Sequence, residues 1–435
     1  MPRELSPFEL DRELARVAPR ARAAYRALRS GREVTLHVPE VLQDPETLER
    51  LAADDSDPIA APLLRHLYWL QLMLSTLPGE GERLRKYREE RHAIDKPLSG
   101  HFSLRELLGH ALRDPRRRPA LLDVMLARGG QLRDAATRLF EVRAELPQFW
   151  GRTRESLELP HPELTSRARS FLADSRDALE SLEARSFHEL LEHALAPHAA
   201  DGWPRQLSLR SLHDLLGNAD WLKGLQLDTG ELPASVSATS FSRGLLRLGA
   251  AWTEALAPAS LPFSVARDPF RLLASQNGAL LASLTTLPAF LKRQLNLGKD
   301  RASEHARALS RSALVFARCL SLRVLLDEPS RRGPRAFIEA FCELGAEALG
   351  FEPPAEAAGV LLRPRAGDAQ RFAGLLLAFQ SRQELAEAHD EDWYRSPRAI
   401  EQLRAETRTP PAVTCSEEAL AAGSRALVAA LAERL

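Results

Sequence analysis

The sequence predicts an all-α protein, a large body of many helices that is not a regular solenoid. Apolar residues recur at steps of three and four along most of the chain, whereas runs that alternate between apolar and polar residues are almost absent. β-Branched residues are few, and aromatic residues make up only 6% of the 435 residues. Helix-start signals are spaced irregularly and no repeat signature recurs between them, which argues against a stacked array of repeats.

Several predicted helices begin at a capping residue followed by proline. The capping side chain accepts a backbone hydrogen bond, and proline is tolerated in the first turn because its missing N–H is not needed there. These pairs are Ser6-Pro7, Asp44-Pro45, Asp57-Pro58, Asp114-Pro115, Asp268-Pro269 and Ser396-Pro397. The apolar pattern predicts helices over residues 7–29, 45–53, 58–77, 80–93, 103–113, 116–128, 130–146, 162–184, 186–196, 208–216, 240–256, 269–284, 288–296, 299–327, 335–349, 368–379, 381–389, 397–406 and 416–434.

Two loop-rich stretches suggest how the chain is divided. Residues 201–239 are rich in Gly, Pro, Ser and Asp, which predicts a connection between an N-terminal helical region, 1–200, and a C-terminal helical region, 240–406. A second such stretch contains Pro410-Pro411 and precedes a terminal helix within 416–435. Either break is also compatible with a single compact body.

Charge and cysteine content exclude several classes of function. Lys+Arg and Asp+Glu are equal at 59 each, so the chain has no net field that would attract nucleic acid or an anionic membrane. Cys319, Cys342 and Cys415 are odd in number and widely spaced, which indicates neither a disulfide framework nor a thiolate metal site. We therefore expect a protein of the reducing cytoplasm that does not bind nucleic acid.

The helix predicted at 299–327 changes character along its length. Its second half, Ala313 to Leu326, is the most apolar run of the chain, but Arg318 and Arg323 interrupt it and it is too short to span a bilayer. The N-terminus is charged from the third residue and leads into no apolar stretch, so no signal peptide is expected. We expect no membrane association, and a central buried position for this half-helix.

The helix predicted at 240–256 is the clearest amphipathic helix near the middle of the chain. Arg243, Arg247 and Glu254 share one side of it. The opposite side is apolar and predicts a core-facing stripe: Phe241, Leu245, Leu248, Trp252 and Leu256.

The segment Phe187–His193 nearly spells the zinc motif His-Glu-x-x-His. Its two histidines, His188 and His193, are five residues apart, whereas zinc needs ligands four apart on one helical face. His188 with Glu192, or Glu189 with His193, could each supply two ligands, but no third ligand is identifiable. A solvated helix face is the favoured interpretation, and a metal site is kept as the alternative.

Other patterns are explained more simply as caps, loops or solvated surfaces. Asp54-Asp55-Ser56-Asp57 resembles an acidic cluster for cations, but it directly precedes Pro58 and has no second acidic motif, so we predict a capping loop. Gly79-Glu80-Gly81 and Gly298-Lys299 lack the residues of a phosphate loop. The short basic runs Arg116–Arg118 and Arg331-Arg332 have no interleaved aromatic residues, which does not favour a nucleic-acid groove.

The octet from Leu246 to Thr253 resembles the zinc-binding helix of oligoendopeptidase F and thimet-oligopeptidase-like metallopeptidases, His-Glu-x-Gly-His-Ala-x-His. Gly249 and Ala251 are the matching positions. The next predicted helix begins near Asp268-Pro269, as the third-ligand helix of that family does. The segment Asp390 to Pro397 is similar to an acidic-Trp-aromatic segment of bacterial members.

The resemblance implies that the zinc site is lost. The two zinc histidines correspond to Leu246 and Ala250, and the general-base glutamate corresponds to Arg247; none of these side chains can do the same chemistry. The following helix has no carboxylate after its capping aspartate. The resemblance therefore implies a pseudoenzyme with no catalytic residue, no metal and no other cofactor.

The predicted function is that of a non-catalytic helical protein that binds a peptide or protein partner along a retained cleft. Its candidate cleft face consists of Arg243, Arg247, Ala250 and Glu254. Two alternatives remain: a divergent metal-dependent peptidase or hydrolase that uses the His188 to His198 segment, and a helical protein–protein interaction scaffold.

Overall fold

The computed structural model describes residues 5–29, 37–54, 57–72, 116, 118–127, 141, 143, 145, 147–148, 157–158, 162–195, 203–204, 206–229, 232, 238–360, 366–408 and 416–435. Within these residues the chain is all-α and contains no strand, so the predicted fold class is confirmed. The α-helices are α1 (Pro7–Arg29), α2 (Pro45–Ala53), α5 (Arg118–Ala127), α8 (Pro162–Asp174), α9 (Arg176–Glu180), α10 (Phe187–Leu195), α11 (Leu209–Leu216), α12 (Ala238–Leu256), α13 (Phe263–Ala266), α14 (Leu272–Ser283), α15 (Pro288–Gln294), α16 (Lys299–Leu325), α17 (Asp327–Arg331), α18 (Pro334–Leu349), α19 (Ala357–Val360), α20 (Asp368–His389), α21 (Pro397–Arg408) and α22 (Glu417–Ala432). Residues 60–72 are also helical, and short 3₁₀ turns include Glu40–Leu42, Ala219–Trp221, Leu284–Thr286 and Trp393–Arg395.

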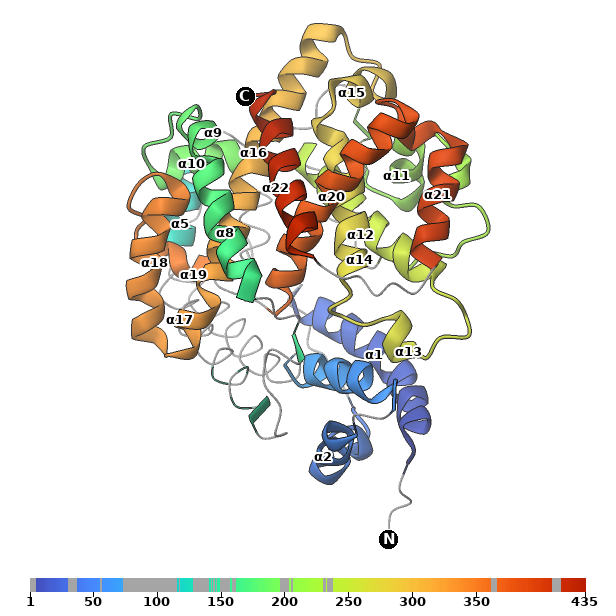
Figure 1. Ribbon diagram of the computed structural model, residues 1–435. Coiled ribbons are helices and arrows are strands. Elements are labelled where there is room, and N and C mark those ends of the chain that lie inside the picture. The colour runs from blue at the N-terminus through green and yellow to red at the C-terminus, as the bar shows by residue number, and fades with distance from the viewer. Residues whose placement is uncertain are drawn as a thin grey trace.

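The helices gather around α16, the longest of those described, and are unequal in length (Figure 1). Helices α8, α10, α15, α18 and α20 all pack against α16. A second series of contacts runs from α12 to α14, from α14 to α20 and from α20 to α22. This arrangement around one shared helix differs from a stack of equal repeats, as the sequence predicts. No described helix has the length and apolar character needed to cross a bilayer.

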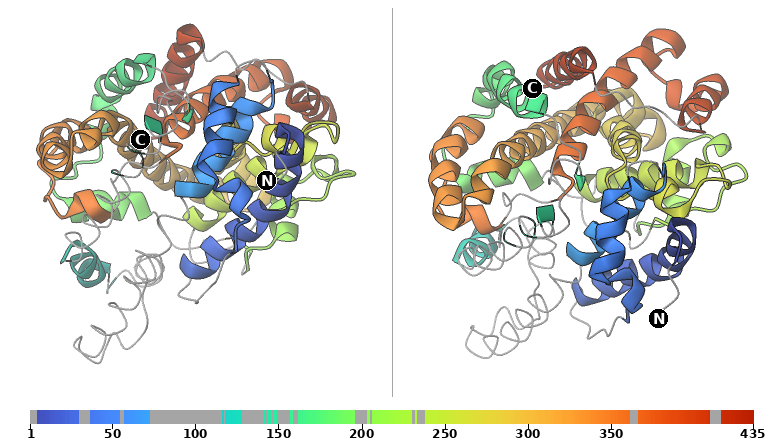
Figure 2. Two further views of the ribbon diagram at one scale, coloured as in Figure 1. Left: turned by 90° about the horizontal axis from the view of Figure 1, so that it is seen from below. Right: turned by 60° about the horizontal axis from the view of Figure 1, so that its bottom comes forward.

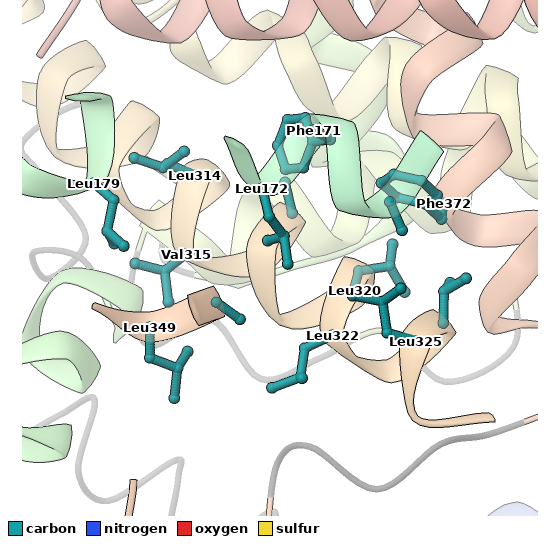
Figure 3. Packing of buried hydrophobic residues seen from close by; sticks show 14 of the residues in the cluster. Phe171, Leu172, Leu179, Leu314, Val315, Leu320, Leu322, Leu325, Leu349 and Phe372 are labelled. Carbon is teal, nitrogen blue, oxygen red and sulfur yellow. The ribbon is translucent and has the colours of Figure 1, made fainter. Parts of the chain in front are cut away.

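The second half of α16 lies in a large hydrophobic core. Figure 3 shows Leu314, Val315, Leu320, Leu322 and Leu325 of α16 among side chains from α8, α9, α18 and α20. The rings of Phe171 and Phe372, from α8 and α20, meet edge to face with their centroids 6.0 Å apart. The predicted central burial of this half-helix is therefore confirmed. Residues from the N-terminal region 1–200 and the C-terminal region 240–406 share this core.

The described residues form two further hydrophobic clusters. One contains the predicted apolar stripe of α12. Each of the five stripe residues is at most 4% exposed, which confirms that the stripe faces the core. The other joins α1, α2 and helix 60–72, and reaches Phe270. Figure 2 shows these blue N-terminal helices beside the yellow-green segment that contains α13.

Most of the predicted capping residues act as caps. Ser6 and Glu9 form reciprocal hydrogen bonds at the start of α1, and Asp44 accepts the Thr47 N–H at 3.0 Å. Asp57 accepts the Ile59 N–H at 2.7 Å, which confirms the predicted capping role of Asp57. Ser396 accepts from the Ala399 N–H. Asp114-Pro115 lies outside the described residues.

Some predicted helix boundaries are wrong. The helix predicted at 162–184 is divided at Ser175 into α8 and α9. The helix predicted from 269 begins at Leu272, because Asp268 accepts the Phe270 N–H in a preceding turn.

Packing explains a third difference. The sequence predicts a break between 368–379 and 381–389, but α20 is continuous from Asp368 to His389. It is held on one side by α14 and on another by α22, and this tertiary contact outweighs the weak local signal for a break. Short helices α13, α17 and α19 are not among the predictions. The helices predicted at 80–93 and 103–113, and the Gly79-Glu80-Gly81 motif, lie outside the described residues.

Candidate functional site

Helices α12 and α14 cross with their backbones in contact. A Cβ added at Gly249 would lie 2.3 Å from the Asn277 carbonyl oxygen, and one added at Gly278 would lie 2.6 Å from the Leu246 carbonyl oxygen. Only glycine fits at such distances, because any larger residue would force the two backbones apart. The glycine that the zinc-helix resemblance identifies therefore lies at a direct helix–helix contact.

A buried hydrogen-bond chain joins this crossing to α21. The Asn277 side chain donates to the Thr253 hydroxyl at 2.9 Å and to the Thr407 hydroxyl at 3.2 Å. Thr253 in turn donates to the Gly249 carbonyl at 2.9 Å. Thr253 is the last residue of the octet that resembles the zinc-binding helix, and its hydroxyl takes part in these structural contacts.

The four residues of the candidate cleft face lie on a partly exposed side of α12. Arg243 is exposed, while Arg247, Ala250 and Glu254 are half-buried. Leu246 is 39% exposed, and among the residues that the structure describes it is one of three large apolar side chains that are exposed, with Phe8 and Phe316. This side of α12 lies opposite its buried apolar stripe.

Glu254 is the centre of a group of arginines. The Arg267 Nη1 atom donates to the Glu254 Oε2 atom at 2.7 Å, and the Arg22 Nη1 atom lies 4.0 Å from the same oxygen. One residue beyond Arg267, Asp268 accepts from the Nε and Nη2 atoms of Arg65 at 2.8 and 2.6 Å. We call the following residues the arginine cluster: Arg22, Arg65, Arg267 and Arg271, with the carboxylates Glu254 and Asp268.

Arg271 contributes to the arginine cluster through electrostatics. Burial lowers the pKa of Arg271, the Glu254 and Asp268 carboxylates oppose that shift, and the Arg267 guanidinium adds to it. Its Nη1 atom donates to the Ala266 carbonyl at 3.3 Å. Arg271 is therefore held by a backbone carbonyl close to both carboxylates and to a second cation.

The N-terminal helices dock on the segment between α12 and α14. The Asp11 carboxylate of α1 accepts the N–H groups of Phe263 and Ser264 at 2.8 and 2.7 Å, and so holds the start of α13. His66 is buried against Trp69 and Phe263, with ring centroids 5.8 and 5.3 Å away. Burial, followed by the nearby Arg22 charge, lowers the pKa of His66 from 6.5 to about 3.

Sequence reasoning missed the N-terminal contribution to this site. The partners of Glu254, Asp268 and α13 from α1 and helix 60–72 are about two hundred residues or more away in the chain. No local spacing links Asp11 or Arg65 to them, so only covariation among homologous sequences could have indicated these pairs.

The alternative metal residues on α10 each have a separate partner. His188 Nε2 lies 2.8 Å from an Asp123 carboxylate oxygen, and Glu192 forms an ion pair with Arg118. The two other residues contact backbone atoms: Glu189 accepts the Arg185 N–H at 2.6 Å, and His193 Nε2 lies 3.1 Å from the Leu182 carbonyl. In the part of the chain that the structure describes, no three His, Cys, Asp or Glu side chains are grouped to hold a metal ion.

The acidic-Trp-aromatic segment, Asp390 to Pro397, contributes Trp393 and Tyr394 to the hydrophobic cluster that contains the apolar stripe of α12. Trp252 of α12 donates its indole N–H to the Trp221 carbonyl at 2.7 Å, and Trp221 donates to the Tyr394 carbonyl at 2.8 Å. The rings of Trp221 and Trp393 meet edge to face at 6.4 Å. This segment therefore supports the position of α12.

Comparison with known proteins gives a likeness of fold. No protein-family model matches the sequence, and no curated protein matches it. A solved structure described as PZ peptidase A with inhibitor 2 superposes with a TM-score of 0.52 over 96% of this chain and 86% of that chain, at 10% sequence identity. The chain thus has a helical fold like that of a peptidase over nearly its whole length, in agreement with the metallopeptidase-like resemblance at the level of fold.

Proposed function

We propose that this protein is a non-catalytic relative of the helical metallopeptidases, which binds a peptide or a peptide segment of a partner along the outward side of α12. The fold likeness to PZ peptidase A supports the scaffold. The observation that carries the proposal is the chemistry of the crossed helices α12 and α14, where the zinc helix and the third-ligand helix of the family are expected.

These two helices lack the groups that metal-dependent hydrolysis needs. Leu246 and Ala250 have no ligand atom, and Arg247 cannot accept a proton from water at neutral pH. Across α12 and α14 the sequence contains no His, Cys or Asp, and a single carboxylate, Glu254. That carboxylate accepts a hydrogen bond from Arg267.

The same side of α12 has groups suited to holding a peptide. At a rise of about 1.5 Å per residue, the distance along the helix from Arg243 to Glu254 is about 16 Å. An extended peptide of about five residues has this length. The positive charges of Arg243 and Arg247 lie toward one end of this side, and the arginine cluster lies at the Glu254 end. The exposed Leu246, between Arg243 and Arg247 in the sequence, offers an apolar contact.

The test combines metal analysis, a peptidase assay and peptide binding on the purified full chain. We expect no stoichiometric transition metal, no hydrolysis of labelled peptides, and binding of some of those same peptides. The double variant Arg243→Glu with Arg247→Glu should weaken binding, whereas Arg335→Glu, at an exposed position on α18, should not.

About one zinc per chain, lost to a chelator together with thermal stability, would overturn this proposal. Replacing His188 by Ala would then show whether the metal is bound on α10, as the hydrolase alternative requires. If peptides bind equally well to the double variant, α12 is not the binding surface, and the scaffold alternative becomes the better explanation.

A further inference from the structure

We infer that the arginine cluster recognises a carboxylate group of the bound peptide, so that the ligand is an acidic peptide or one with a free C-terminus. This inference rests on the proposed function, because the arginine cluster lies at the Glu254 end of the same side of α12. It adds the chemical class of the ligand, and it follows from the geometry, exposure and charge of the cluster.

The arginines of the cluster converge from three separate segments. Arg22 comes from α1, Arg65 from helix 60–72, and Arg267 and Arg271 from the connection between α13 and α14. The Arg22 Nη2 atom donates to the Arg267 carbonyl at 3.3 Å, which links the first segment to the third. Folding therefore brings these like charges together, although they repel one another.

The side chains are fixed but still reach solvent. Arg22 lies over the Trp69 ring at 5.3 Å, and Arg271 donates to a backbone carbonyl, so both guanidinium groups are oriented before a ligand arrives. The side chains of Arg22, Arg65, Arg267, Glu254 and Asp268 are between 11% and 31% exposed. A small charged group from solvent can therefore approach them.

The charge balance of the arginine cluster favours an anion. Its four arginines and two carboxylates give a formal charge of +4 − 2 = +2. In a half-buried setting such an excess is less screened than on an open surface, and one further carboxylate would reduce it. The planar guanidinium group is matched to carboxylates because it can donate two parallel hydrogen bonds.

The test uses peptides of about five residues, the length expected from the α12 surface, each labelled at its N-terminus with an uncharged fluorophore. Three peptides share one neutral sequence: one has a free C-terminus, one a C-terminal amide, and one an amide with an internal glutamate. Fluorescence anisotropy with the full chain measures the dissociation constant of each. We expect the amidated neutral peptide to bind about tenfold more weakly than whichever peptide supplies the preferred carboxylate.

Two variants and a control test the residues. Arg271→Gln should weaken binding of the preferred peptide about tenfold, and Arg335→Gln on α18 should leave it unchanged. Glu254→Gln should strengthen binding, because it raises the formal charge of the cluster to +3. A structural role alone would not produce tighter binding on removal of a native ion-pair partner.

Each outcome separates this inference from the proposed function. If all three peptides bind equally, the carboxylate inference is wrong while peptide binding stands. If no peptide binds to the wild-type chain, the proposed function fails first. Circular dichroism and thermal unfolding establish that each variant is folded; if Arg271→Gln is unfolded, the Glu254→Gln result and the comparison of the three peptides still decide the question.

Discussion

Two regions of the molecule accommodate arginine in different ways. In the core around α16, Arg318 is 1% exposed and donates to neutral groups at the C-terminal ends of α8 and α18. Its acceptors are the carbonyls of Ala348, Leu172 and Glu347, at 2.8 to 2.9 Å, and the Ser175 hydroxyl. In the arginine cluster, by contrast, half-buried guanidinium groups surround two carboxylates and remain in contact with solvent.

The two settings differ in the exposure of the guanidinium groups and in the charge of their acceptors. The last carbonyls of a helix have no partner within the helix and carry partial negative charge, so Arg318 joins the ends of two helices without any carboxylate. The hydrogen bonds of Arg318 therefore stabilise the positions of α8 and α18. The arginine cluster combines partial exposure with an excess of positive charge.

Trp252→Ala should cause the largest decrease in the free energy of unfolding. A decrease of that size would show that the inner side of α12 is as tightly packed as the core around α16. Trp252 is 2% exposed and donates to the Trp221 carbonyl. The cavity should lower the free energy of unfolding by about 3–5 kcal/mol, measured by chemical denaturation. A loss below about 1 kcal/mol would mean that the core refills the cavity.

Arg318→Met should lower the free energy of unfolding by about 3 kcal/mol, because it leaves buried carbonyls of two helices without donors. The matched control is Arg335→Met, since Arg335 is 92% exposed and its one ion-pair partner among the described residues is Glu339 on its own helix. That change should stay within about 0.5 kcal/mol. Equal effects of the two variants would contradict the structural role given to Arg318.

His66 should make the N-terminal docking sensitive to acid. Because the folded chain holds the pKa of His66 at about 3 and the unfolded chain restores it to 6.5, the unfolded state binds more protons between these values. The free energy of unfolding should therefore fall as pH decreases from 6.5 towards 3, by up to about 1.4 kcal/mol per pH unit. Above pH 6.5 this contribution is constant.

The His66→Leu variant isolates this effect from the carboxylates that titrate in the same range. Neither ring nitrogen of His66 has a hydrogen-bond partner, so leucine should be tolerated there. The measurement is the difference in unfolding free energy between wild type and variant as a function of pH. A difference that does not change with pH would show that His66 is not buried against Phe263 in solution.

Arg247→Ala should have the smallest effect on stability, within about 0.5 kcal/mol, because the side chain is half-exposed on the outward side of α12. Peptide binding is expected to weaken in the same variant. This combination would confirm that the outward side serves a ligand and not the fold. A loss of stability above about 2 kcal/mol would place Arg247 with Arg318 among the structural arginines.

The fold class, many of the described helices and the inner side of α12 could be predicted from the amino-acid sequence. These features depend on local physics: the 3.6-residue period places Phe241, Leu245 and Trp252 on one side, and residues such as Ser6 and Asp44 cap helices through hydrogen bonds to neighbouring N–H groups. The absence of zinc-binding residues from the octet is likewise a property of the sequence.

The contacts between charged residues depend on the tertiary fold and could not be predicted from the sequence. The sequence marks Arg318 as an interruption of an apolar helix, but its function as a link between two helix ends depends on α8 and α18. Likewise, the arginine cluster exists because α1 and helix 60–72 dock beside α13. Such contacts join residues far apart in the chain, and no local periodicity encodes them, because the free energy that selects them comes from packing the whole body.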